Sequence, residues 1–312
     1  MYLKKIMAVF LCTVFFFSTA ATTVFAAAAD TETIQGKLIA VENILYGTPQ
    51  TGALLDRINR LEKDYEGTHP AAGMSMINRV DTLYNTMFEN SSTVSVLTQM
   101  NAIEWAIAHQ VSMEPVQVRI ANMEKMIQGA PKEGTYKSRL ESLSGYAFGG
   151  VAIPLKQIAV PANTLIKISL VTPINSKNLK AGDKIQYKVA ADVVENGMLL
   201  FAQGAPGEGV VNKVTQARNF GRDAKVEIDF QQIRAIDGTQ TETFLGEESK
   251  KEMKSMTMAA GASVAGMVLL GPVGIVTGAF VNGKTIDLPA GTEMYIQTKN
   301  DTTLFGIQTT AQ

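Results

Sequence analysis

Side chains able to perform catalysis or bind a metal are scarce in this chain of 312 residues, which contains two histidines and one cysteine. His69 lies in a turn rich in glycine and proline. His109 follows Glu104 by five residues, a spacing that does not bring two ligands together on a helix. Motifs of serine hydrolases, zinc proteases and phosphate-binding loops are absent from the sequence. We therefore expect no enzyme, no bound metal and no cofactor.

Three arginines in the first half of the chain are the best candidates for binding chemistry. Arg57 and Arg139 occupy equivalent places in two segments that match at an offset of 82, and Arg79 follows a looser copy. One interpretation is structural: the stem of Arg57 packs on an apolar helix face, and its guanidinium reaches a carbonyl or a carboxylate such as Glu42. The alternative is a ladder of Arg57, Arg79 and Arg139 that binds an anionic polymer along the surface of a repeat array.

The arginines belong to an internal repeat that predicts helical hairpins over residues 33–148. At the offset of 82, Gly47 matches Gly129 and the turn residues that follow also match. Gly47 suits the left-handed end of a helix, and Pro49 prevents that helix from continuing. A second amphipathic helix, which carries the arginine, then begins after the turn.

Residues 153–312 change to short alternating segments, which predict a small antiparallel β barrel or sandwich. Hairpin turns are expected at Asn196-Gly197 and Asp237-Gly238. Residues 160–164 reappear in similar form at residues 288–292, so we expect the first and last strands to enter through matching turns; if these strands pair, the sheet closes across the insert. The fold class is therefore α+β: a helical-hairpin repeat, then a β domain that carries a glycine-rich helical hairpin insert.

The insert at residues 255–283 carries no charged side chain. Glycines expected to form a glycine zipper, and to make a membrane or oligomer contact, recur along it: Gly261, Gly266, Gly271, Gly274 and Gly278. Small residues at helical spacing let a second backbone approach closely. Because Leu270-Gly271-Pro272 divides the stretch, we expect a helical hairpin packed on its own domain, on a second copy, or in a membrane. A single kinked spanning helix is the remaining possibility.

The N-terminus has the pattern of a secretory signal peptide over residues 1–26. Lys4 and Lys5 precede an apolar segment at 6–17, and small residues surround a cleavage site after Ala26. An uncleaved anchor helix is the alternative, although the apolar segment is shorter than the roughly 20 residues that span a bilayer. Cleavage would remove the cysteine. The net charge of −1 and the lack of a basic patch argue against nucleic acid as a partner.

Both halves resemble exported cell-envelope proteins of diderm bacteria. The β half is similar to a domain that opens on an IPAGT-like stretch and can carry a glycine-zipper insert before a second such stretch; here Asn163 replaces the usual glycine, which stands at Gly291 in the second copy. The helical half resembles repeats with the pattern E-x-x-L-Y-G, seen at residues 42–47. The resemblance implies an exported protein, periplasmic or associated with the outer membrane. It implies no chemistry.

These observations favour a non-enzymatic structural or binding protein of the envelope. The helical repeats would serve as a scaffolding or binding arm, and residues 255–283 would contact a membrane or a second copy. Cell-wall polymer or another envelope protein is a possible partner. The alternatives are an enzyme or accessory acting on cell-wall polymer through a cleft between the halves, and a pore-forming assembly.

Overall fold

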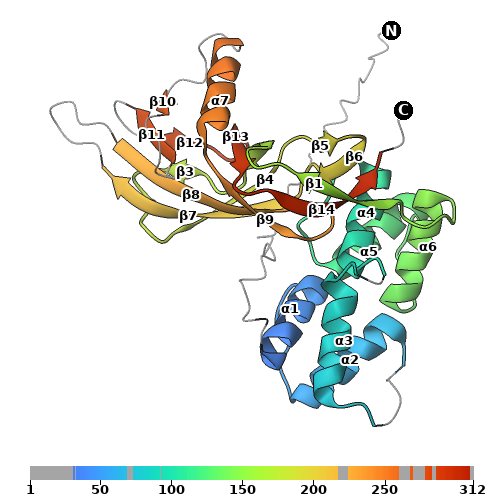
Figure 1. Ribbon diagram of the computed structural model, residues 1–312. Helices are drawn as coiled ribbons and strands as arrows, with labels where there is room; N and C mark the ends of the chain where they lie inside the picture. Colours follow the sequence, from blue (N-terminus) through green and yellow to red (C-terminus); the bar gives the residue numbers. More distant parts are fainter. Residues whose placement is uncertain are drawn as a thin grey trace, which may run out of the picture.

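The computed structural model consists of a helical array followed by an antiparallel β domain (Figure 1). It describes residues 31, 33–68, 73–91, 93–216, 224–259, 268–269, 278–282 and 286–309. The predicted α+β class is confirmed at this level. The predicted signal peptide, residues 1–26, lies outside the described residues.

Six helices of equal length form the array. They are α1 (Ile34–Tyr46), α2 (Leu54–Glu66), α3 (Met76–Phe88), α4 (Val96–Ala108), α5 (Val116–Gln128) and α6 (Tyr136–Phe148). Each has 13 residues. The structural repeat is thus a single helix with its turn, shorter than the helical hairpin that the sequence predicted. The offset of 82 relates α1 to α5 and α2 to α6, so it links helices four positions apart in the array.

The helices of the array begin in two different ways. The helices α1, α3, α4 and α6 begin at a hydroxyl side chain that accepts a backbone N–H: Thr33, Ser75, Ser95 and Thr135. The helices α2 and α5 begin without such a bond, at Ala53 and Pro115. His109 ends α4 with φ of 52°, in the place where Gly47 ends α1 with φ of 91°.

The β domain is built on a closed six-stranded barrel. Its strands are β2 (Leu165–Leu170), β4 (Lys184–Val189), β7 (Pro206–Thr215), β8 (Ala224–Arg234), β9 (Gln240–Phe244) and β13 (Glu293–Thr298). They follow the order β8-β7-β4-β2-β13-β9, and β9 pairs again with β8 to close the ring. Alternate side chains point inward, and Tyr187 and Phe230 stack edge to face with centroids 5.4 Å apart in the core.

A second sheet lies between the barrel and the helices. It contains β1 (Leu155–Val160), β14 (Thr302–Gln308), β6 (Met198–Phe201) and β5 (Val193–Glu195), in that order. The strands β3 (Ile174–Asn175) and β12 (Asp287–Leu288) form a separate short pair. Figure 1 shows α4 as the helix of the array that lies against this side of the β domain.

The matching turns at 160–164 and 288–292 lead into neighbouring strands of the barrel, although the first and last strands of the described domain are β1 and β14. The strands β2 and β13 that follow them are antiparallel neighbours. Asn163 and Gly291 both have positive φ, 67° and 87°. Each turn also bonds to the end of the other strand: the N–H of Asn163 donates to Thr298 O at 2.8 Å, and that of Gly291 donates to Leu170 O at 2.7 Å.

The prediction of a helical hairpin at 255–283 is wrong for the strands described within this stretch. Helix α7 (Glu247–Ala259) enters it, and β10 (Val268–Leu269) and β11 (Gly278–Asn282) follow as strands. Strand β11 pairs with β8, and β10 pairs with β11. The physical reason is an available edge on the long strand β8, along which residues 278–282 pair with residues 224–228. Gly261, Gly266, Gly271 and Gly274 lie outside the described residues, and Gly278 begins β11.

No helix within the described ranges is long and apolar enough to cross a membrane.

Candidate functional site between the helices and the barrel

Arg57 forms a buried ion pair that joins two consecutive helices. Its Nε and Nη2 donate to the two carboxylate oxygens of Glu42 at 2.8 and 2.7 Å. The backbone N–H of Gln50, in the turn between the helices, donates to the same carboxylate at 2.9 Å. The structural interpretation of Arg57 is therefore confirmed: its guanidinium reaches Glu42.

The same contact recurs along the array. Glu104 on α4 accepts from the backbone N–H of Ser112 at 2.7 Å and from Arg119 Nε on α5 at 2.9 Å. The other such pairs in the described part of the chain are Glu124 with Arg139, where Lys132 gives the backbone N–H, and Glu62 with Arg79. Arg119 was missed in the sequence, although an offset of 62 from Arg57 would have found it.

The three arginines of the predicted polymer-binding ladder are held inside these pairs. The side chains of Arg57, Arg79 and Arg139 are 10, 11 and 12% exposed, and each guanidinium contacts a glutamate. Hydrogen bonding to its glutamate raises the pKa of each arginine. This geometry ties adjacent helices together. Polymer binding by the ladder stays a prediction.

The sequence-predicted turn at Asp237-Gly238 links β8 to β9 and is also the point where the barrel meets α4. The carbonyl oxygen of Asp237 accepts from Thr98 Oγ1 at 2.9 Å, and Ile236 O accepts from Asn101 Nδ2 at 2.9 Å. A Cβ on Gly238 would lie 2.8 Å from the side chain of Leu97, so glycine allows the close approach. These contacts fix the turn against the first two turns of the helix.

Two further contacts extend this junction along α4. Trp105 Nε1 donates to Asp192 Oδ2 at 2.8 Å, and the N–H of Val111 donates to Gln203 O at 2.7 Å. A Cβ on Gly204, where φ is +88°, would overlap the carbonyl oxygen of Val111. The array and the β domain are thus joined by hydrogen bonds and by backbone contact, as the two halves of one rigid body would be.

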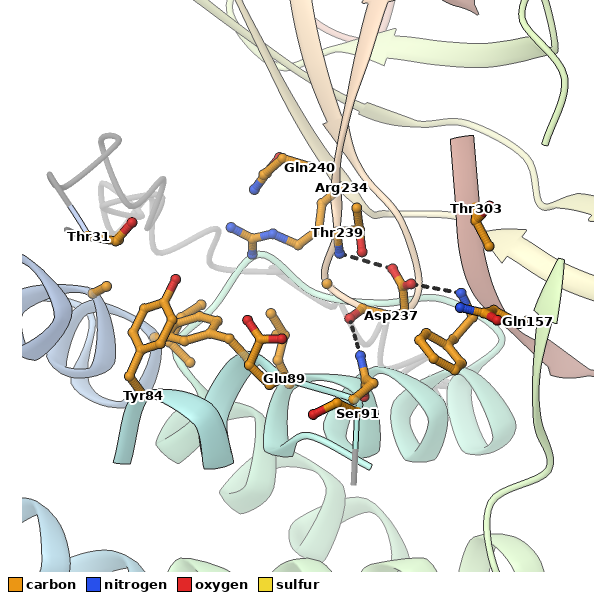
Figure 2. A pocket seen from close by; sticks show the side chains of 17 residues that line it. Thr31, Tyr84, Glu89, Ser91, Gln157, Arg234, Asp237, Thr239, Gln240 and Thr303 are labelled. Carbon is orange, nitrogen blue, oxygen red and sulfur yellow. Dashed lines mark hydrogen bonds between the residues drawn. The ribbon is translucent and has the colours of Figure 1, made fainter. Parts of the chain in front are cut away.

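Beside this junction lies a pocket of about 720 Å³ (Figure 2). Tyr84, Phe88 and Glu89 line it from the end of α3, while Arg234 and Gln240 line it from β8 and β9. The volume is within the range of roughly 300–1,000 Å³ that is usual for small-molecule sites. A cleft between the halves was among the alternatives that the sequence left open, but no sequence feature pointed to the residues that line this pocket.

Arg234 differs from the arginines of the array because it has no carboxylate partner. Over the described ranges, no acidic side chain forms an ion pair with it; Gln240, with its amide oxygen facing the guanidinium, accepts from Nε at 3.2 Å and Nη2 at 3.3 Å. Figure 2 shows the guanidinium directed away from Asp237, toward the side of the pocket where Thr31 and Tyr84 lie. Burial, and after it the nearby charge of Arg119, lowers the pKa of Arg234 to about 10, although the charge of Glu208 acts in the opposite direction.

Glu104 and His109, the pair examined as metal ligands, make other contacts in the structure. Glu104 holds Arg119, and His109 forms the end of α4 with its ring edge-on to Trp105 at 5.9 Å. Among the residues with described positions, no three His, Cys, Asp or Glu side chains gather as a metal site would require.

Comparisons with known proteins give little guidance. No family model and no curated protein matches the chain. A solved structure that it resembles is ComB10 of the Com type IV secretion system of Helicobacter pylori, at 14% identity and a TM-score of 0.25. The likeness covers 46% of this chain and 88% of that one. At this TM-score the likeness carries no argument about function.

Proposed function

We propose that the protein is a non-enzymatic structural and binding component of the bacterial cell envelope, in which the helical array and the barrel act as one rigid scaffold. The observation that carries the proposal is the junction of α4 with the turn at 235–239. Thr98 and Asn101 bond to the backbone of that turn, and a Cβ on Gly238 would lie 2.8 Å from Leu97 Cδ2, so the turn packs closely on the helix. An arm that swings freely from its barrel would not need this junction.

The charge pattern of the array supports a framework role. The glutamate and arginine of each joined helix pair face one another, so these strong polar groups are used to hold helices in place. Buried pairs of this kind specify one arrangement of neighbouring helices more than they add stability. The remaining surfaces, including the interdomain pocket, are then available for partners.

Export and attachment belong to the same proposal. The signal-like pattern at 1–26 supports export to the periplasm or to the outer membrane, and the charge-free residues 255–283 provide the contact with a membrane or a second copy. Fractionation of the host envelope tests both. The full protein should be recovered with envelope fractions, and deletion of 255–283 should release it to the soluble periplasmic fraction. Recovery of the full protein in the cytoplasm would contradict the proposal.

The pocket between the halves keeps one alternative in view, an enzyme that acts on cell-wall polymer. Incubation of purified protein with purified cell wall separates the two functions. We expect no release of soluble sugar or peptide above a heat-treated control, and time-dependent release would replace the scaffold by the enzyme.

A further inference from the structure

The unpaired arginine of the interdomain pocket is the least expected charge in the described part of the molecule. Arg57, Arg79, Arg119 and Arg139 each form an ion pair with a glutamate, whereas among the described residues the guanidinium of Arg234 bonds to an amide oxygen, and Glu208 acts on it only through its charge. Removing a cation from water without an anion beside it is costly. Because the other buried arginines are paired, the unpaired guanidinium of Arg234 at the edge of a cavity points to a ligand that would supply the anion.

The guanidinium is suited to one kind of chemistry. Its nitrogens form a rigid fork that matches the two oxygens of a carboxylate, and such paired bonds are stronger when little water competes. The array shows this geometry repeatedly, for example at Arg57 and Glu42. Among the described residues that line the pocket, no carboxylate forms such a pair with Arg234, so a ligand could supply the two oxygens.

The remaining lining restricts the ligand further. Tyr84 and Phe88 stack with ring centroids 4.8 Å apart, and with Phe305 they give the pocket an apolar surface. Two acidic residues line the pocket. The charge of Glu89 disfavours a doubly charged anion. The carboxylate of Asp237 accepts the backbone N–H groups of Thr239 and Phe305. A singly charged ligand with an apolar body therefore fits better than a phosphate.

We propose that the interdomain pocket binds a small carboxylate-terminated ligand, with Arg234 donating to the carboxylate and the aromatic side chains of α3 contacting its apolar body. The inference rests on the binding role proposed above and gives it a ligand class of about dipeptide size. Gln240 holds the guanidinium in place and would remain its second partner. Glu89 adds a position for an ammonium group on the same ligand.

The test is a set of titrations on the purified exported protein, followed by calorimetry or by ligand NMR. The probes are alanyl-alanine, its C-terminal amide and inorganic phosphate. We expect saturable binding of alanyl-alanine that is at least about tenfold tighter than binding of the amide, since the amide lacks the charge that Arg234 would bond. Phosphate should bind more weakly than the dipeptide.

Two variants assign the binding to the residue. Arg234→Met should weaken alanyl-alanine binding by at least about tenfold, while Arg60→Met, which changes an exposed arginine of α2, should leave it unchanged. Thermal unfolding of both variants establishes that each is folded. Equal affinity for the dipeptide and its amide, tighter binding of phosphate, or unchanged binding by Arg234→Met would each overturn the proposal, as would no saturable binding of the dipeptide. None of these results would alter envelope fractionation, which tests the scaffold separately.

Discussion

The helical array and the interdomain pocket treat buried arginine in opposite ways. In the array Arg119 is held by Glu104 and by Asn101, whereas in the pocket Arg234 faces a cavity with no acidic partner among the described residues. The two guanidinium groups are close enough that the charge of Arg119 lowers the pKa of Arg234. The comparison suggests two roles for a buried arginine. Where the chain supplies the carboxylate, the ion pair joins two helices; where it does not, the guanidinium is available to bind the carboxylate of a ligand.

The largest loss of stability should come from removing one partner of a buried ion pair in the array. Glu104→Ala leaves the buried guanidinium of Arg119 without its carboxylate and Ser112 without an acceptor, and should lower the free energy of unfolding by about 3–5 kcal/mol. Glu66→Ala is the control, because its pair with Lys137 is about half exposed and should be worth about 1 kcal/mol or less. Urea unfolding measures both. Similar losses of stability in Glu104→Ala and Glu66→Ala would show that a buried ion pair contributes no more here than an exposed one.

The junction between the two regions should be nearly as sensitive. Gly204→Ala forces a methyl group into the carbonyl oxygen of Val111 at positive φ, and should cost about 2–3 kcal/mol. Gly197→Ala also has positive φ, of +75°, but open space around it, so only the backbone cost of about 1 kcal/mol is expected. Hydrogen exchange in α4 and in the 235–239 turn should rise for the first variant only. Equal stability losses and equal hydrogen exchange in the two variants would mean that the helical array and the β domain are not tightly packed at this junction.

Acid should weaken the helical array. Burial raises the pKa of Glu124, but hydrogen bonds from Arg139 and from the Lys132 N–H outweigh this and hold it below its usual value. A carboxyl whose pKa is lowered by folding stabilises the folded state at neutral pH, and this contribution disappears as pH falls through the lowered pKa. The free energy of unfolding should therefore decrease below about pH 5. Arg139→Met should show a shallower decrease, and an unchanged slope would contradict the pairing.

The sequence predicted much of the array because its signals are local. Gly47 and Pro49 mark a helix end, and Arg57 lies one helix after Glu42 at a distance that the repeat makes visible. The pair of Glu104 with Arg119 was missed because α4 ends at His109, without the glycine that ends α1, α2 and α5.

The pocket could not be predicted in the same way. Arg234 follows an alternating strand and precedes an Asp-Gly turn, which is an ordinary position for a charged residue. Its place opposite Tyr84 depends on how the barrel meets the array, a contact between segments about 150 residues apart. The strands at 268–269 and 278–282 were missed for a related reason, since the free edge of β8 is a property of the folded sheet.

The most direct measurement compares Arg119→Met with Arg234→Met in one series of urea unfolding curves without ligand. Arg119→Met leaves Glu104 buried and unpaired, so the free energy of unfolding should fall by about 3–5 kcal/mol. Arg234→Met removes a cation that forms no ion pair with any described carboxylate, so the free energy of unfolding should stay within about 1 kcal/mol of the parent or rise. Equal losses in the two variants, or a larger loss for Arg234→Met, would show that Arg234 stabilises the fold as Arg119 does. The guanidinium in the pocket would then not be free to bind a ligand.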